Sequence, residues 1–171
     1  TWIVLTDGGR DLAFNISSDL LPVYLTTVLT MGVVQIGLFR TLRGWATVMS
    51  SLAAGWLSDR FGERQIIVAG FLLEALGLLL MLQAHTMLEL VPAALFFGIG
   101  LGMLFPAFDS LISKVIPENM RGSTFGLLDS SRNMLAIPGP MIGGELMQNV
   151  SPSLPFILTA AINLLCAAGA W

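Results

Sequence analysis

Long apolar runs separated by short polar breaks fill almost the whole chain, and this pattern limits the possible folds more than any other feature. A helix needs about 20 residues to cross the hydrocarbon core of a bilayer. Six runs approach or exceed that length, which predicts an all-α bundle of six transmembrane helices in one domain, residues 1–171. Because every break is short, helices adjacent in sequence should pack as antiparallel hairpins. The predicted spans cover residues 2–28, 34–57, 65–82, 88–112, 122–147 and 154–171.

The composition agrees with a membrane protein and excludes several other classes. Only 11% of the residues are charged and 55% are hydrophobic, whereas a soluble domain is usually about a quarter charged. A soluble enzyme and a disordered chain are therefore excluded. Eight Lys and Arg against eleven Asp and Glu leave no basic patch for nucleic acid. The single cysteine, Cys166, excludes an internal disulfide and a cysteine-based metal cluster, and we predict no cofactor or metal.

Basic residues in the breaks indicate the orientation, because Lys and Arg concentrate in cytoplasmic loops. Arg60 and Arg64 lie in the loop after the second span, and Lys114 and Arg121 bound the loop after the fourth. The other three loops hold no basic residue. We therefore expect these two loops and the N-terminus to be cytoplasmic, in an integral protein of the cell (plasma or inner) membrane. Both ends of the sequence lie in apolar runs, so we expect the chain to be a fragment.

The loop between the second and third spans reads Gly-Trp-Leu-Ser-Asp-Arg-Phe-Gly-Glu-Arg. Gly55 is expected to allow close approach of a neighbouring helix. Gly62 can adopt the left-handed backbone that reverses the chain. The charges of Asp59, Arg60 and Arg64 should lie at the membrane surface, where they can pair with each other or with the ends of neighbouring helices.

This loop resembles the signature loop of the major facilitator superfamily, although Glu63 occupies a position that is basic in the family. Residues 117–122, Pro-Glu-Asn-Met-Arg-Gly, resemble the acidic–Arg-Gly turn that these transporters carry after the fourth helix. A glycine-proline stretch in the fifth span resembles the one typical of the antiporter branch, with Leu135 in place of an upstream glycine. That stretch contains Gly139, Pro140, Gly143 and Gly144.

The resemblance implies one six-helix half of a twelve-helix transporter, in which two halves rock about a central cavity. Each half has a 3+3 inverted repeat, so that the second span corresponds to the fifth. The N-terminal half is favoured, because residues 21–25, Leu-Pro-Val-Tyr-Leu, resemble the outer end of the family's first helix. The C-terminal half remains the alternative. The expected partners are a small-molecule substrate, the proton as coupling ion, the lipid bilayer and the missing second half, with no nucleic acid.

Ionisable residues at membrane depth mark either a pathway or a buried pair. On the first span, Asp7, Arg10, Asp11 and Asn15 fall on one face at about 100° per residue. In one interpretation, Asp11 couples protons or substrate and Asn15 lines the cavity. In the other, Asp7 and Asp11 only neutralise Arg10. Glu74 lies at the centre of the third span and should point inward to a neighbour.

Five further charges on predicted spans carry specific predictions. Asp19 and Arg40 are expected at the same height, so we predict that they form an ion pair. Arg43 lies nearer the centre and could hold an anionic group of the substrate. Asp129 and Arg132 share a face of the fifth span at i, i+3 and can satisfy one another. Alternatively, Arg132 pairs with the carboxylates of the first span.

These features predict a secondary active transporter that moves a small solute by alternating access, driven by protons, with a preference for efflux or antiport. The alternatives are an uncoupled facilitator or a symporter of the same fold, and a receptor or assembly factor that no longer transports. We do not expect an enzyme. An intramembrane protease needs a nucleophile and a base, and the only histidine, His85, is predicted in an external loop.

Overall fold

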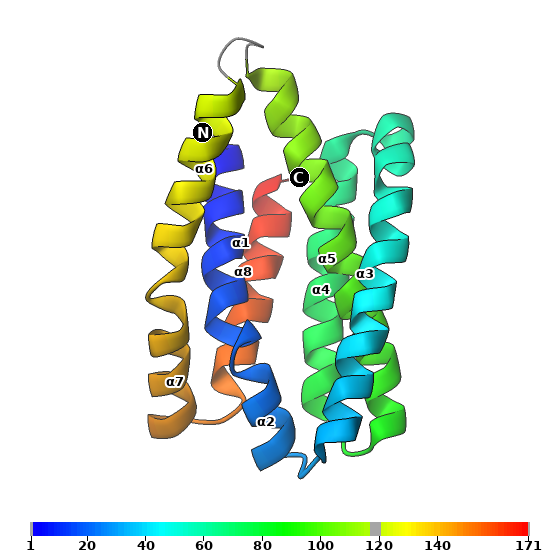
Figure 1. Cartoon of the computed structure of the whole chain (residues 1–171), viewed down its shortest axis with the longest axis vertical. Helices are drawn as coiled ribbons and strands as arrows, with labels where there is room; N and C mark the ends of the chain where they lie inside the picture. The colour runs from blue at the N-terminus through cyan, green and yellow to red at the C-terminus, as the bar shows by residue number, and fades with distance from the viewer. Residues whose placement is uncertain (1, 117–120, 171) are drawn as a thin grey trace.

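The computed structural model describes residues 2–116 and 121–170, apart from the side chains of residues 2–7, 115, 121, 132, 135 and 136. The described part of the chain forms an all-α bundle (Figure 1). Its helices are α1 (Trp2–Ser18), α2 (Leu21–Thr27), α3 (Val33–Phe61), α4 (Glu63–Gln83), α5 (Met87–Val115), α6 (Arg121–Ala136), α7 (Gly139–Asn149) and α8 (Leu154–Ala170).

The first and fifth predicted spans are each broken into two helices, whereas the other four correspond to the single helices α3, α4, α5 and α8. The break between α1 and α2 precedes Pro22, and the break between α6 and α7 precedes Pro140; each proline lies in the first turn of the following helix. A proline has no N–H to donate to the preceding turn, so it starts a helix more readily than it continues one.

Two of the described helices, α4 and α5 (to Lys114), are long and apolar enough to cross a membrane by length and composition alone. Helix α8 is apolar but shorter. Helix α3 has sufficient length but carries Arg40, Arg43 and several hydroxyl residues. The more polar helices thus need protein or water beside them, while α4 and α5 can be surrounded by apolar groups.

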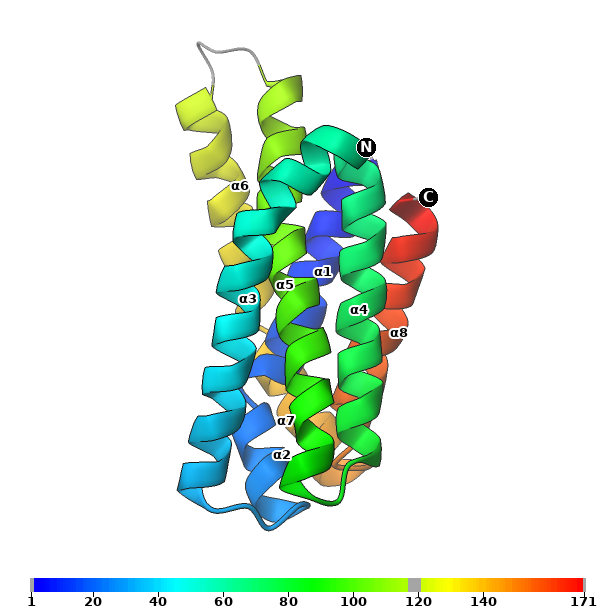
Figure 2. The same cartoon turned by 90° about the vertical axis from the view of Figure 1, so that its right-hand side faces the viewer.

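The helices form two groups that meet along α4 and α8 (Figures 1 and 2). Helices α3, α4 and α5 pack together in one group, and α1 packs against α6, α7 and α8 in the other. The first helix of each three-span repeat, α1 or α5, therefore packs against the second and third spans of the other repeat. This exchange of partners agrees with the inverted repeat that the family resemblance implies.

Glycines allow the closest approach between helices in both groups. A Cβ at Gly102 of α5 would overlap the backbone carbonyl of Thr47 on α3, and a Cβ at Gly143 of α7 would overlap that of Ile16 on α1. The close helix approach expected at Gly55 is not made within the described part of the chain. Gly55 is exposed, and a Cβ there would meet no described atom within 4 Å. The face of α3 that packs on α5 passes through Thr47 rather than Gly55.

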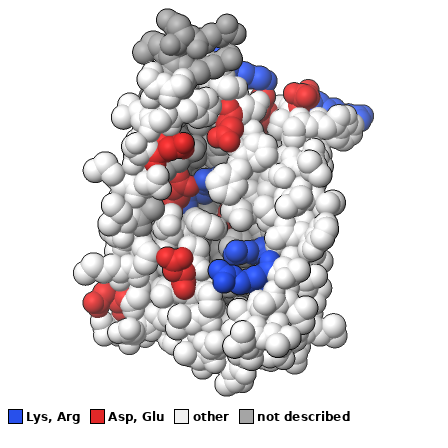
Figure 3. Space-filling model, in the orientation of Figure 1, with Lys and Arg blue, Asp and Glu red and all other residues white. Residues whose placement is uncertain are grey.

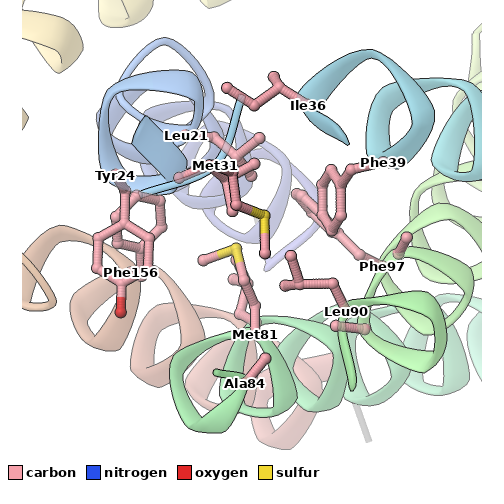
Figure 4. Close-up of a cluster of buried hydrophobic side chains, with 14 of the residues drawn as sticks. Leu21, Tyr24, Met31, Ile36, Phe39, Met81, Ala84, Leu90, Phe97 and Phe156 are labelled. Atoms are coloured by element: carbon pink, nitrogen blue, oxygen red, sulfur yellow. The ribbon is translucent and has the colours of Figure 1, made fainter. Parts of the chain in front are cut away.

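Two hydrophobic clusters occupy the two ends of the bundle, which we call the Gly62 end and the Ala84 end. The cluster at the Ala84 end joins α2, α3, α4, α5 and α8 (Figure 4), and the rings of Tyr24 and Phe156 lie 4.8 Å apart in it. The cluster at the Gly62 end joins only α4, α5 and α8. On α4, Phe71 belongs to the cluster at the Gly62 end and Ala75 to the cluster at the Ala84 end. Glu74 therefore lies between the two apolar regions.

Candidate functional site

An ion pair on α1 forms the centre of the site. Arg10 Nη2 donates to Asp11 Oδ1 over 2.5 Å, and Arg10 Nε donates to the same oxygen over 3.2 Å. Arg10 is 3% exposed and Asp11 is 8% exposed. Neighbouring residues on a helix do not normally face each other, so the pair forms only because the arginine side chain folds back along α1.

Aromatic rings of α5 cover the guanidinium of Arg10. Its Cζ lies 4.3 Å from the centroid of the Phe105 ring and 5.7 Å from that of Phe108. A ring face attracts a cation, and this attraction is stronger away from water. Arg10 Nη1 has no hydrogen-bond partner in the described part of the chain. The N–H groups of Nη1 on this buried cation are therefore still available.

Glu74 points from α4 into the same region and is only 1% exposed. Its carboxylate interacts electrostatically with Arg10, Asp11 and Arg43, and the amide of Asn163 from α8 lies beside it. Among the described residues, neither Glu74 Oε2 nor either amide atom of Asn163 has a partner with ordinary hydrogen-bond geometry. The expectation that Glu74 points inward is confirmed. We call Arg10, Asp11, Glu74 and Asn163 the interior cluster.

Asn15 and Arg43 lie at the border of the interior cluster. Asn15 is half-buried and donates through Nδ2 to the backbone oxygen of Asp11 over 2.7 Å. Arg43 is half-buried on α3, and its Cζ lies 5.2 Å from the centroid of the Phe97 ring. The structure thus brings two of the predicted pathway residues, Asp11 and Arg43, to the region between the two helix groups, and it places Asn15 one turn from Asp11 on α1, against Gly139 of α7.

The predicted ion pair between Asp19 and Arg40 is absent from the described salt bridges, which join Arg10 to Asp11 and Glu63 to Lys114. Asp19 and Arg40 are both exposed. The expectation assumed an unbroken first helix, whereas Asp19 lies in the break between α1 and α2, where the helical face is interrupted.

The α6 residues are placed only in part. Asp129 is exposed on α6, and the side chain of Arg132 lies outside the described part of the chain. Helix α6 packs against α1, so Asp129 belongs to the same helix group as Asp11. The pairing of Arg132 remains a prediction.

Acidic and basic side chains face each other across one face of the molecule (Figure 3). Acidic groups gather over the side formed by α1, α6 and α7, and a basic group lies beside α3. The surface is hollowed between them.

The glycine-proline stretch positions α7 against this region. A Cβ at Gly139 would lie 2.8 Å from Asn15 Cβ, so any side chain there would displace α1 or α7. Pro140 lies in the first turn of α7. A Cβ at Gly144 would meet no described atom within 4 Å. Gly139 and Gly143, rather than Gly144, therefore set the distance between α7 and α1.

The loop from Gly55 to Arg64 forms a tight reversal between α3 and α4. Gly62 has φ of 89°, the positive value that the sequence predicts, and its N–H donates to the oxygen of Ser58 over 2.9 Å. Asp59 is exposed. The Arg60 guanidinium lies over the ring of Trp56, 5.4 Å from its centroid. These side chains surround the reversal at the surface of the Gly62 end.

Two residues of this loop connect α4 to other helices. Arg64 Nε donates to the backbone oxygen of Ala170 at the end of α8, which confirms that a charge of this loop pairs with the end of a neighbouring helix. Glu63 accepts hydrogen bonds from Lys114 and Ser110 of α5. We call Glu63, Ser110 and Lys114 the end cluster. No sequence pattern predicted this cluster, although an acidic residue, Glu63, in a position that is basic in the family was a usable signal that a cation lies nearby.

Three curated relatives are similar to parts of the chain. "Quinolone resistance protein NorA" of Staphylococcus aureus (strain MRSA252) is 29% identical over 154 residues, which cover 90% of the chain and 39% of that relative. "Putative multidrug resistance protein MdtD" of Pectobacterium carotovorum subsp. carotovorum (strain PC1) is 32% identical over 70% of the chain and 26% of the relative. "Probable anion transporter 3, chloroplastic" of Arabidopsis thaliana is 31% identical over 71% of the chain and 24% of the relative.

The match to a family model covers nearly the whole described structure. The model of the Major Facilitator Superfamily matches residues 10–171, which include the interior cluster, the loop at Gly62 and the glycine-proline stretch. The helical bundle, its exchanged packing partners and this match agree with one another. The chain therefore belongs to the Major Facilitator Superfamily of integral membrane transport proteins.

Proposed function

We propose that this chain forms part of a secondary active transporter that moves a small solute by alternating access, coupled to protons and working as an exporter. The observation that carries the proposal is the buried Arg10–Asp11 ion pair beside Arg43. Charged groups at membrane depth are costly and are retained where they serve a pathway. Membership of the family and the names of two drug-resistance relatives support transport and efflux.

The chain covers only 24–39% of the length of these three relatives. We infer that it is one six-helix half, the N-terminal one, of a transporter whose cavity is completed by a second half. The Gly62 end then faces the cytoplasm with the N-terminus, in the cell membrane. The two basic loops at that end support this orientation.

In this proposal, three groups of residues have distinct roles. Asp11, Asn15 and Arg43 line the pathway, together with Asp129 and Arg132 of α6. The loop from Gly55 to Arg64, with Asp59, Arg60 and Gly62, acts as a conformational gate at the Gly62 end. The close contact of Gly139 and Gly143 with α1 keeps the first and fifth spans moving as one body.

The proposal is tested with the full-length protein in proteoliposomes, using a fluorescent quinolone as the probe. An imposed proton gradient should drive quinolone transport against its own gradient, and Asp11→Asn should abolish this while leaving downhill flux measurable. Glu145→Gln is the matched control, because Glu145 is exposed and contacts only Asn149 among the interactions described for it. If the rate of quinolone flux in the unaltered protein did not depend on the proton gradient, proton coupling would be contradicted.

A further inference from the structure

Glu74 is a buried carboxylate to which the proposed function assigns no role. It lies in the middle of α4, between the two hydrophobic clusters, where its backbone packs against α5: a Cβ at Gly100 would lie 2.5 Å from the Glu74 nitrogen. A charge in such a place costs several kcal/mol unless it is neutralised by a partner or by a proton. Its retention in an otherwise apolar helix therefore needs a specific explanation.

The groups around Glu74 come from each helix that packs near it. Helix α1 contributes Arg10 and Asp11, and α3 contributes Arg43. Helix α8 contributes the amide of Asn163 and, slightly farther along, the thiol of Cys166. The α5 residues Phe97 and Gly100 bring no titratable group to this part of α4. The surroundings thus combine two cations, one further carboxylate and one amide.

Asn163 is suited to both protonation states of a carboxyl group. Its Nδ2 can donate to an ionised carboxylate, and its Oδ1 can accept from the O–H of a protonated one. Both amide atoms are buried and lack partners of ordinary geometry among the described residues, as does Glu74 Oε2. Rotation of the amide therefore exchanges a bond to the charged form for a bond to the neutral form without breaking any other contact.

Protonation of Glu74 also changes the charge balance around Arg10 and Arg43. When Glu74 is ionised, the formal charges of Arg10, Arg43, Asp11 and Glu74 cancel. When Glu74 is protonated, one positive charge is left in excess, and Arg10 remains held by Asp11 through Nε and Nη2. The excess charge then falls on Arg43, which is half-buried on α3. Protonation of Glu74 would thereby strengthen the attraction of Arg43 for an anionic group.

We propose that Glu74 is a proton-binding site inside this half of the transporter, and that Asn163 is the partner that serves both of its states. The inference rests on the proton coupling proposed above and names the group that takes the proton. One proton from water binds Glu74 Oε2 and later returns to water on the other side of the membrane. The O–H bond of the hydronium ion that delivers the proton breaks as the Glu74 O–H bond forms, and the reverse exchange releases the proton.

The test is infrared difference spectroscopy of the full-length protein in lipid, with the pH stepped from about 5 to about 9, on either side of ordinary carboxyl values. We expect the unaltered protein to show the carbonyl band of a buried protonated carboxylic acid. The same band should be present in Asp11→Asn and in the surface control Glu145→Gln, and it should be lost in Glu74→Gln. A band that persists unchanged in Glu74→Gln, or that is lost in Asp11→Asn instead, would overturn the proposal.

A second variant keeps the proposal testable if Glu74→Gln does not fold. Asn163→Leu retains Glu74 but removes the acceptor for its proton, so the carbonyl band should move to the position of a carboxylic acid without a hydrogen bond. An unchanged band position would contradict the role of Asn163. Because these spectra require no transport, a failure of proton-driven quinolone flux would count against the proposed function alone, and the band would still decide the role of Glu74.

Discussion

The interior cluster and the end cluster both join helices through charged side chains, but they satisfy those charges differently. In the end cluster, Glu63 receives hydrogen bonds from both Ser110 and Lys114, and the Lys114 side chain is 60% exposed. In the interior cluster, Glu74 and Asn163 are each 1% exposed, and both retain buried polar atoms without partners of ordinary geometry among the described residues.

On the proposals above, this difference separates a structural contact from a functional one. Water can solvate Lys114 whenever its bond to Glu63 breaks. The end cluster therefore adds little to the free energy of unfolding, and its charges carry little desolvation cost. The interior cluster is almost completely buried, so water solvates its polar groups far less, and each unpaired polar atom there lowers stability. Groups that reduce stability in this way are retained where they serve an activity. The comparison therefore predicts that substitutions at the two sites differ in the size of their effect and in its dependence on salt.

The largest effect is expected from Arg10→Met. This change leaves Asp11 buried without its cation, and breaking a buried pair in this way costs about 3–5 kcal/mol. The melting temperature of the full-length protein in detergent should fall sharply, and the double variant Arg10→Met/Asp11→Leu should recover part of the loss because no unpaired charge remains on α1. A single variant as stable as the unaltered protein would show that the pair is not buried in the working transporter.

An intermediate effect is expected from Asn163→Leu. The change removes the amide that lies beside the buried Glu74 carboxyl, and loss of the partner of a buried polar group costs about 1–3 kcal/mol. The melting temperature should therefore fall, by less than in Arg10→Met, and transport driven by a proton gradient should fall as well. The matched control is Thr159→Val on the same helix. Thr159 donates to the oxygen of Ala13 over 2.9 Å, so its loss should lower the melting temperature and leave the dependence of transport on the proton gradient unchanged. A lower melting temperature with unchanged proton-driven transport in Asn163→Leu would mean that Asn163 is a structural residue.

The smallest effect is expected in the end cluster. Lys114→Gln removes an exposed partner of Glu63, so the melting temperature should fall far less than in Arg10→Met. The difference in melting temperature between Lys114→Gln and the unaltered protein should vanish at high salt, because salt screens exposed charges. Exchanging the two charges with Glu63→Lys and Lys114→Glu should restore the melting temperature at low salt. A large loss that persists at high salt would place this contact in the same class as the interior pair.

The sequence was sufficient for the local features of the fold. The apolar runs predicted the helical segments, and the glycine at position 62 predicted a reversal that the structure makes with φ of 89°. It did not indicate that the first and fifth spans break before Pro22 and Pro140. A proline is compatible with either a kink or a new helix start, and the outcome depends on which neighbouring helices pack against each part.

The sequence by itself determined which residues carry charge at membrane depth, because helix length and periodicity are local properties of the chain. Tertiary structure alone decided which of those charges meet. It separated Asp19 from Arg40, and it brought Glu74 beside Asn163, which is 89 positions away in the sequence. Such contacts depend on how spans distant in sequence pack face to face, and no local pattern specifies that arrangement.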